Sequence, residues 1–137
     1  MTTLDIIRNI RVASRTVSVA FEKETGSTIR HLLVLHALAE GDMIQSRVSE
    51  LTGIDRSTMT GIVAKMEAAE YIKAQNVPHD NRAKSLHLTA KGRAHLEKLQ
   101  AALEKLFGDR FGLPDRRAST LLNLLSTVAN QDGQAAA

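Results

Sequence analysis

The chain has 137 residues, of which 43% are hydrophobic and only 3% aromatic, so aliphatic side chains must form most of its core. It has no cysteine, which excludes disulfides, thiolate metal ligands and a thiol redox switch. No stretch approaches the ~18 uninterrupted apolar residues of a membrane span, and arginines interrupt the amino-terminal segment, so we expect no membrane association and no signal peptide. These features favour a cytoplasmic protein, most simply of one domain, or subdivided if it is elongated and helical.

The net charge of +3 is concentrated in one part of the chain. Residues 45–95 contain 8 Lys and Arg against 5 Asp and Glu, whereas the remaining residues contain 10 of each. The whole positive excess therefore lies in the middle segment. The position of this positive charge indicates a polyanionic partner for the middle segment more strongly than the size of the charge does.

Residues 4–24 have apolar residues spaced by four and three, which predicts an amphipathic helix with arginines on its other faces. Gly26 ends this helix, and Ser27 or Thr28 can cap the next one. The second helix is apolar around much of its circumference and is therefore expected to be a buried core strut, ended by residues 40–42. The apolar residues of the two helices are Ile6, Ile10, Ala13, Val17 and Ala20, then Leu32, Val34, Leu35 and Leu38.

Two short helices joined by a tight turn are predicted next. The third helix should run from about Gln45 to Leu51 and bury Val48 and Leu51. Asp55 can cap the fourth helix by accepting a hydrogen bond from a free amide in its first turn. In the fourth helix, Ile62, Val63 and Met66 should face inward, whereas Arg56, Ser57, Thr60, Gly61 and Lys65 should face outward.

Residues 71–75 and 84–88 are strand candidates on either side of a basic loop, residues 78–84. Thr89 can cap a long fifth helix, which residues 108–112 break or bend, and Pro114 suits the first turn of a sixth helix. The fifth helix has a heptad-like apolar seam and the sixth is rich in leucine. These residues are Leu96, Leu99, Leu103 and Leu106, then Leu121, Leu122, Leu124, Leu125 and Val128.

This order of elements predicts a mainly α fold, an α+β winged helix-turn-helix, with six helices and a wing of two or three strands. Residues 28–106 are expected to form the winged helix-turn-helix domain with its long connecting helix. Residues 1–27 and 107–130 should form a helical dimerisation region, and residues 131–137 a disordered tail. The alternative is a monomer that folds both ends onto one core. The expected dimer contacts are Ile6, Ile10, Val17, Leu121, Leu124, Leu125 and Val128.

The fourth helix has the composition of a recognition helix. Short side chains at its start allow the backbone to approach DNA, and their hydroxyls can donate to phosphates or base edges. Arg56 and Lys65 are far enough apart to bind phosphates on either side of a groove. The simpler interpretation of Ser57 and Thr58 is that they only assist capping. The residues expected to contact DNA here are Arg56, Ser57, Thr58, Thr60, Gly61 and Lys65.

The basic loop is expected to form the tip of a wing, with Arg82 as its principal DNA contact in a narrow minor groove. Asp80 would be repelled by DNA and is expected to orient Arg82 or to stabilise the loop through a charge-assisted bond. His79 and Lys84 add positive or titratable charge near phosphates. The alternative is a solvated turn whose charges have no role.

Other chemistries have little support in the sequence. The histidines do not form a metal-ligand pattern: His31 and His36 are five residues apart, and His79, His87 and His95 fall on different predicted elements. The glycines are dispersed, and no serine lies in a nucleophile elbow. We therefore expect no metal, no cofactor and no enzymatic activity. A winged-helix protein–protein adaptor that never binds DNA remains the alternative function.

The middle segment resembles the MarR (multiple antibiotic resistance regulator) family of winged-helix transcription factors. The resemblance rests on the order and spacing of several short motifs through about 50 residues, and the flanking helices extend it over nearly the whole chain. The motifs lie at residues 48–55, 57–60, 62–67 and 71–72, in the wing sequence at 80–83 and in Leu-Thr-x-x-Gly at 88–92.

The resemblance implies an obligate dimer on a pseudo-palindromic DNA operator, usually a repressor released by a small aromatic or anionic ligand. In this family the ligand tends to lie between the dimer helices and the DNA-reading domain, where Arg15, His31 and His36 could reach it, or could instead make ordinary polar contacts. Three positions depart from the family pattern. Gly61 replaces a frequent long side chain, Glu70 a usual glycine and Ala74 a common strand arginine.

Overall fold

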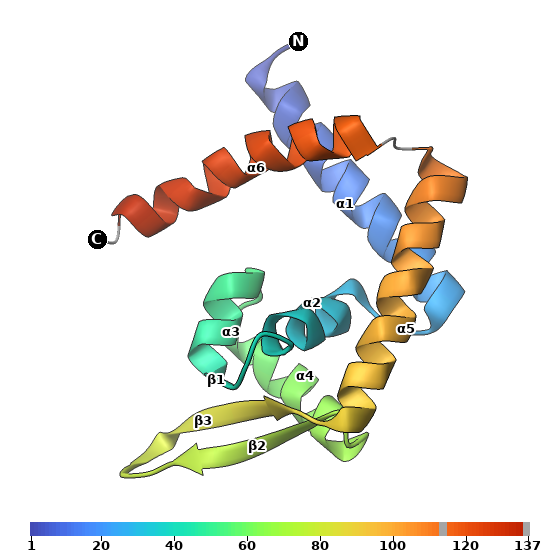
Figure 1. The fold of residues 1–137 in the computed structure, drawn as a ribbon. Helices are drawn as coiled ribbons and strands as arrows, with labels where there is room; N and C mark the ends of the chain where they lie inside the picture. The colour runs from blue at the N-terminus through green and yellow to red at the C-terminus, as the bar shows by residue number, and fades with distance from the viewer. Residues whose placement is uncertain (113–114, 136–137) are drawn as a thin grey trace. The chain divides into compact units, whose positions relative to one another are not determined.

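The computed structural model describes residues 1–112 and 115–135, and within them it confirms the predicted six helices and the winged-helix class (Figure 1). The chain divides into two compact units, Met1–Leu103 and Glu104–Ala137. In chain order the elements are α1 (Thr3–Thr25), α2 (Ile29–Leu38), β1 (Met43–Ile44), α3 (Gln45–Thr52), α4 (Arg56–Ala68), β2 (Ile72–Val77), β3 (Asp80–Leu88), α5 (Ala90–Leu106), the π-helical segment η1 (Phe107–Phe111) and α6 (Asp115–Ala135).

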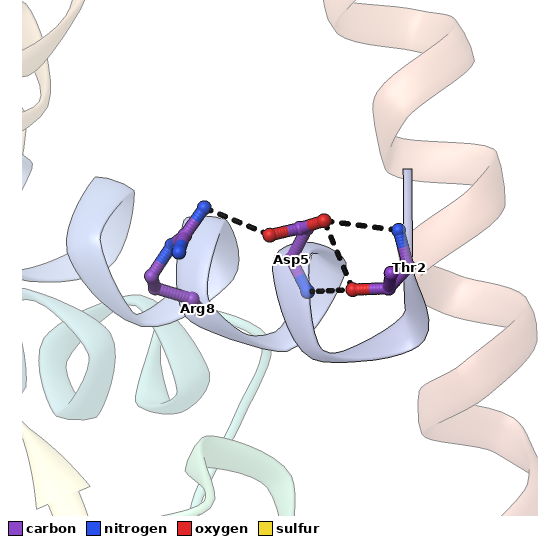
Figure 2. Close-up of polar contacts among 3 residues, drawn as sticks. All are labelled: Thr2, Asp5 and Arg8. Atoms are coloured by element: carbon purple, nitrogen blue, oxygen red, sulfur yellow. Dashed lines mark hydrogen bonds and ion pairs between the residues drawn. The ribbon is translucent and has the colours of Figure 1, made fainter.

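Helix α1 begins with a capping box, shown in Figure 2. The amide of Asp5 donates to Thr2 Oγ1 at 3.2 Å, and the amide of Thr2 donates to the Asp5 carboxylate at 3.0 Å. Arg8, one turn later, forms an ion pair with the other carboxylate oxygen at 2.9 Å. Two otherwise free amides of the first turn are thereby satisfied. At the other end, Gly26 takes the left-handed conformation (φ 74°) that closes many helices.

Only the carboxyl-terminal part of α1 is buried. Ala20 and Phe21 lie in the core, and Phe21 is fully inaccessible. By contrast, Ile6 and Ile10, on the predicted apolar stripe, keep 49% and 47% of their surface exposed. Residues 3–25 therefore form the predicted helix, but the first half of its apolar stripe is exposed.

Helix α2 is the core strut that the sequence predicted. Thr28 caps it, accepting a hydrogen bond from the amide of His31 at 3.2 Å, and its four expected apolar residues are buried. The helix contacts α1, α3, α4 and β3, so it lies at the centre of the first unit. The largest fully buried side chains of this core are Phe21, Val34, Leu35, Leu38, Val48, Met59, Met66, Ile72 and Leu86.

Helix α3 corrects one core prediction. Val48 is fully buried, but Leu51 is 53% exposed. The buried face of α3 is centred on Val48, Ser49 and the half-buried Thr52, and a 100° step per residue turns Leu51 away from it. The apolar spacing predicted that Leu51 is buried because it is more hydrophobic than its neighbours. The packing of α3 against α2 and α4 instead determines which face of the helix is buried.

The wing is a three-stranded antiparallel sheet in the order β1-β3-β2. The two-residue strand β1 pairs with β3 through Met43 and Leu86, and β2 pairs regularly with β3 from Ile72 opposite Leu88 to Asn76 opposite Lys84. The register then shifts, and Val77 faces Asp80. Residues 81–83 of β3 are therefore an unpaired bulge near the end of the hairpin.

The turn of the wing is shorter than predicted. Strand β3 already begins at Asp80, so residues 80–84, expected in a loop, belong to a strand. Proline fixes φ near −65° at position 78, and His79 takes a φ of +66°, the combination typical of a type II turn. A two-residue tip, Pro78–His79, is thus enough to reverse the chain.

A group of hydrogen bonds joins the end of α4, the start of β2 and the start of α5. Thr89 caps α5 as predicted: its Oγ1 accepts from the amide of Gly92 at 3.0 Å and donates to the carbonyl of Glu70 at 2.7 Å. It also lies 3.0 Å from the carbonyl of Tyr71, which accepts from the amide of Thr89 as well. Glu70 takes a left-handed φ of 64°, so the fold keeps the conformation although the usual glycine is absent.

The second unit contains the end of α5, η1 and α6. Residues 107–111 form a π-helical turn that ends at Gly112, which has a φ of 57°, so the predicted break after α5 is confirmed. Pro114 lies outside the described residues. The large apolar side chains of α6 that the structure describes are exposed, from 40% for Leu125 to 72% for Val128. The helix continues to Ala135, into the segment expected to be a disordered tail, where alanine and glutamine favour helix.

Candidate nucleic-acid interface

The start of α4 is organised around Asp55. Its Oδ2 accepts from the Ser57 hydroxyl at 2.6 Å and from the Thr58 amide at 3.0 Å, and its Oδ1 accepts from the Thr58 hydroxyl at 2.7 Å. The Ser57 hydroxyl, followed by the hydroxyl and amide of Thr58, holds the pKa of Asp55 well below its usual range. Both hydroxyl protons are therefore engaged within the chain, as the capping interpretation expected. The hydroxyl oxygens of Ser57 and Thr58 keep lone pairs that can still accept a hydrogen bond.

The face of α4 turned away from the core is polar and open, as predicted. Met59, which the sequence analysis did not assign to the core, is buried on the opposite face together with the three residues that it did assign. On the open face, Thr60 Oγ1 donates to the carbonyl of Arg56 at 3.1 Å, and Gln45 of α3 lies 3.5 Å from the same hydroxyl. The exposed residues of this face are Arg56, Ser57, Thr60, Gly61 and Lys65, and Thr58 is half-buried.

The wing brings four of the predicted residues to the outer end of the hairpin. His79, Asp80, Arg82 and Lys84 are all exposed. His79 is in the tip, whereas Arg82 lies in the bulge of β3 rather than at the tip itself. The carboxylate of Asp80 accepts from the backbone amide of Arg82 at 3.0 Å. Of the two expected roles of Asp80, the observed one is therefore stabilisation of the loop backbone.

Four cations of α4 and the wing have no ionic partner among the side chains that the structure describes. Within residues 1–112 and 119–131, no carboxylate lies within ion-pair distance of Arg56, Lys65, Arg82 or Lys84, although Arg8 and Arg47 do have such partners. A phosphate contact at these four side chains would therefore not require an internal ion pair to break. The four cations are free to bind an external anion.

Two contacts tie the wing to α4, and neither was predicted, since the sequence indicated only that Thr89 caps α5. The amide of Ala74, on the edge strand β2, donates to Glu67 Oε2 at 2.8 Å, which satisfies an outward-pointing strand amide with a side chain of α4. At the base of the hairpin, Thr89, which follows β3, bonds to the carbonyls of Glu70 and Tyr71 in the segment after α4. The sequence around Glu67 did not predict this hydrogen bond, because an exposed glutamate on a helix is common and Ala74 becomes adjacent to it only in the folded chain.

A polar pocket of about 370 Å³ lies in the first unit, between α1, the start of α2 and the turn before α4. None of the three predicted ligand residues lines it, although Arg15 and His31 are neighbours in sequence of lining residues. His36 instead lies 3.2 Å from Gln100 of α5. Charged and polar side chains dominate the pocket lining: Ser14, Ser18, Glu22, Thr28, Arg30, Thr52 and Asp55, with Ile29, Leu33, Gly53 and Ile54.

Two of the histidines, His31 and His95, lie in half-buried positions. Burial, and then the charges of Lys65 and His95, lower the pKa of His31, while Glu22 opposes this effect. His95 stacks on Tyr71 with ring centroids 4.2 Å apart. Within the described part of the chain, no three His, Cys, Asp or Glu residues are grouped as metal ligands, and no helix has the length and apolar character to cross a membrane.

The comparisons with known proteins agree with this geometry. The MarR family model matches residues 25–83, which contain α2, α3, α4, β2 and the start of β3. The HTH-type transcriptional regulator SarZ of Staphylococcus aureus is 25% identical to the chain over 111 residues, covering 80% of this chain and 74% of SarZ.

Solved structures extend the similarity over the whole chain. A MarR-family transcriptional regulator from Rhodococcus sp. RHA1 superposes with a TM-score of 0.80 at 26% identity, covering 94% of this chain and 96% of that one. BpsR of Bordetella bronchiseptica, whose DNA binding is regulated by 6-hydroxynicotinic acid, superposes with a TM-score of 0.79 at 24% identity, covering 91% and 98%. These relatives are transcriptional regulators, not enzymes. The family model, SarZ and the Rhodococcus structure together support a MarR-family winged-helix, DNA-binding transcriptional regulator.

Proposed function

We propose that the protein is a homodimeric repressor that binds a pseudo-palindromic DNA operator and is released by a small aromatic or anionic effector. Helix α4 would enter the major groove, and the wing would place Arg82 against the neighbouring backbone or minor groove. The observation that carries the proposal is the open, cationic face of α4 held beside an exposed cationic hairpin by the Glu67–Ala74 hydrogen bond. Because its partner is DNA, the protein would act in the cytoplasm.

The exposed apolar faces of α1 and α6 support the proposed dimer. A single chain leaves Ile6, Ile10, Leu121 and Leu124 between 47% and 65% exposed, which is unfavourable for such large side chains in water. Burial of ~1,000 Å² of apolar surface between two copies would contribute about 25 kcal/mol before the entropy of association is subtracted. The amino- and carboxyl-terminal helices, residues 1–27 and 107–130, would supply this surface.

A two-fold dimer would present its two α4 helices to successive major grooves, about 34–36 Å apart. The exposed cations of α4 and the wing would displace counterions from phosphates, so affinity should fall steeply with salt concentration. Arg56, Lys65, Arg82 and Lys84 would provide these phosphate or groove contacts. Thr60 would then provide contact with base edges.

The effector would bind near the junction of α1 and α2. Arg15, His31 and His36 remain our candidates for direct contact, and the polar pocket beside them offers Arg30 to an anionic group. The regulation of the similar protein BpsR by 6-hydroxynicotinic acid supports an aromatic anion as the class of effector. Occupation of this pocket, which also contacts Asp55, would act directly on the first turn of α4.

Fluorescence anisotropy with labelled DNA from upstream of the protein's own gene tests the proposal. Arg82→Ala should weaken operator binding by about 1–3 kcal/mol, or roughly 5- to 150-fold, and leave the dimer intact. Lys105→Ala, which removes an exposed cation from α5 instead, is the matched control and should leave affinity unchanged. Absence of an anisotropy increase at every salt concentration tested would refute the proposal and favour the protein–protein adaptor.

A further inference from the structure

Gly61 is a glycine for which the fold gives no reason. It lies inside α4 and is exposed, and a Cβ added there would meet no heavy atom within 4 Å apart from its chain neighbours and the nearby backbone of its own helix. Its φ is not in the left-handed region, in contrast to Gly26, Gly53 and Gly112, which end helices. Neither backbone conformation nor packing therefore requires glycine at this position.

Glycine at position 61 also weakens the helix. Compared with alanine, a glycine inside an exposed helix shifts the folding equilibrium toward the unfolded state by roughly fivefold. A glycine that lowers the stability of the fold and makes no packing contact suggests a role in binding another molecule. Its position indicates that role, because Gly61 lies on the open face of α4 one turn after Ser57 and one turn before Lys65.

The surface that Gly61 offers has a definite chemistry. Inside an α-helix the backbone N–H and C=O groups are engaged in intrahelical bonds, so this residue presents only its Cα and hydrogens. Such a surface can neither donate nor accept a hydrogen bond, and it is recessed between the side chains of Ser57 and Lys65. In the major groove, the feature that matches a shallow apolar recess is the C5-methyl group of thymine.

We propose that Gly61 is a specificity-determining residue that receives a thymine methyl group in each half of the operator. This inference rests on the proposed function, since it requires α4 to enter the major groove. With glycine at position 61, the helix backbone approaches the base edge closely. Any larger side chain would fill the recess and push α4 away from that base.

The test combines a protein variant with a base substitution. We expect Gly61→Ala to raise the melting temperature, because alanine is the better helix former, yet to weaken operator binding at least tenfold. Ala101→Ser, which adds a single atom at an exposed position of α5 outside the DNA-contacting face, should leave operator affinity unchanged. Binding to a scrambled duplex should be the same for all three proteins, since phosphate contacts dominate it.

Thymine-to-uracil substitution, which removes only the methyl group, is then made one position at a time in the operator. At the contacted position, uracil should weaken binding of the unaltered protein but strengthen binding of Gly61→Ala, because it removes the methyl that clashes with the new Cβ. If Gly61→Ala binds the operator within twofold of the unaltered protein, or if no position gives this reversal, the proposal is wrong. Both outcomes presuppose specific DNA binding, whereas failure of the proposed function would appear as no binding by the unaltered protein.

Discussion

Gly92 is the glycine whose replacement should damage the fold most. A Cβ at this position of α5 would overlap the carbonyl oxygen of Tyr71 and would lie 2.7 Å from Leu88 Cδ1 and 2.9 Å from Tyr71 C. Two of these three atoms belong to the backbone, so no side-chain rotation relieves the overlap. The first turn of α5 would have to move away from the start of β2.

The magnitude follows from what this movement disturbs. Overpacking of a tight site costs about 1–3 kcal/mol. The Tyr71 carbonyl also accepts from the amide of Thr89 at 3.0 Å, and the Thr89 hydroxyl, which donates to Glu70 at 2.7 Å, lies 3.0 Å from the same carbonyl. Weakening of these contacts adds about 1–3 kcal/mol. The better helix propensity of alanine returns about 1 kcal/mol at most. We therefore expect Gly92→Ala to destabilise the protein by about 3 kcal/mol, which lowers Tm by roughly 10 °C.

Thermal unfolding followed by circular dichroism, at one protein concentration for all samples, measures this effect. Gly61→Ala is the matched comparison, since it makes the same change in a helix with open space around it and should raise Tm slightly. A Gly92→Ala protein that melts at or above the temperature of the unaltered protein would refute the packing argument. Equal shifts for the two variants would refute it as well.

Three further predictions concern the recognition helix, the histidines and the dimer. Asp55→Ala should lower Tm and helix content because three hydrogen bonds are lost, whereas Asp55→Asn should lose less; equal losses would contradict the capping role. Burial is the main cause that lowers the pKa of His31 below its ordinary value of 6.5, so the unfolded chain gains a proton first as pH falls. Stability should therefore be full above about pH 6.5 and decline below it, and His31→Gln should reduce the decline in a series of Tm measurements; an unchanged decline would exclude His31 as its source. Leu124→Glu should produce monomers in sedimentation velocity, whereas its neighbour Asn123→Glu should not, and a Leu124→Glu protein that stays dimeric would remove α6 from the interface.

Local signals in the sequence predicted most of the helices. Thr28, Asp55 and Thr89 cap the helices that they were expected to cap, and Gly26 ends α1. Each of these predictions depends on a side chain and a backbone group within four residues of each other. Such contacts form in almost any tertiary context, so the sequence alone was sufficient.

The wing and α3 depended on contacts between distant residues. Strand β1 has two residues and exists only because β3 lies beside it, so no periodicity could reveal it. The bulge that contains Arg82 arises from the register between β2 and β3, which the turn at Pro78–His79 imposes. Leu51 was assigned to the core by its hydrophobicity, but the neighbours of α3 determine which face is buried.

The candidate site likewise combines features that the sequence predicted with features that only the fold determined. The sequence by itself determined the chemistry of α4 and the wing: hydroxyls and cations on an outward face, and a basic hairpin after it. Only the tertiary structure decided how these groups are placed, because it linked Glu67 of α4 to Ala74 of β2 and left space around Gly61. The physical reason is that side-chain type and helical period are local properties, whereas hydrogen-bond partners and free space depend on which segments the fold brings together.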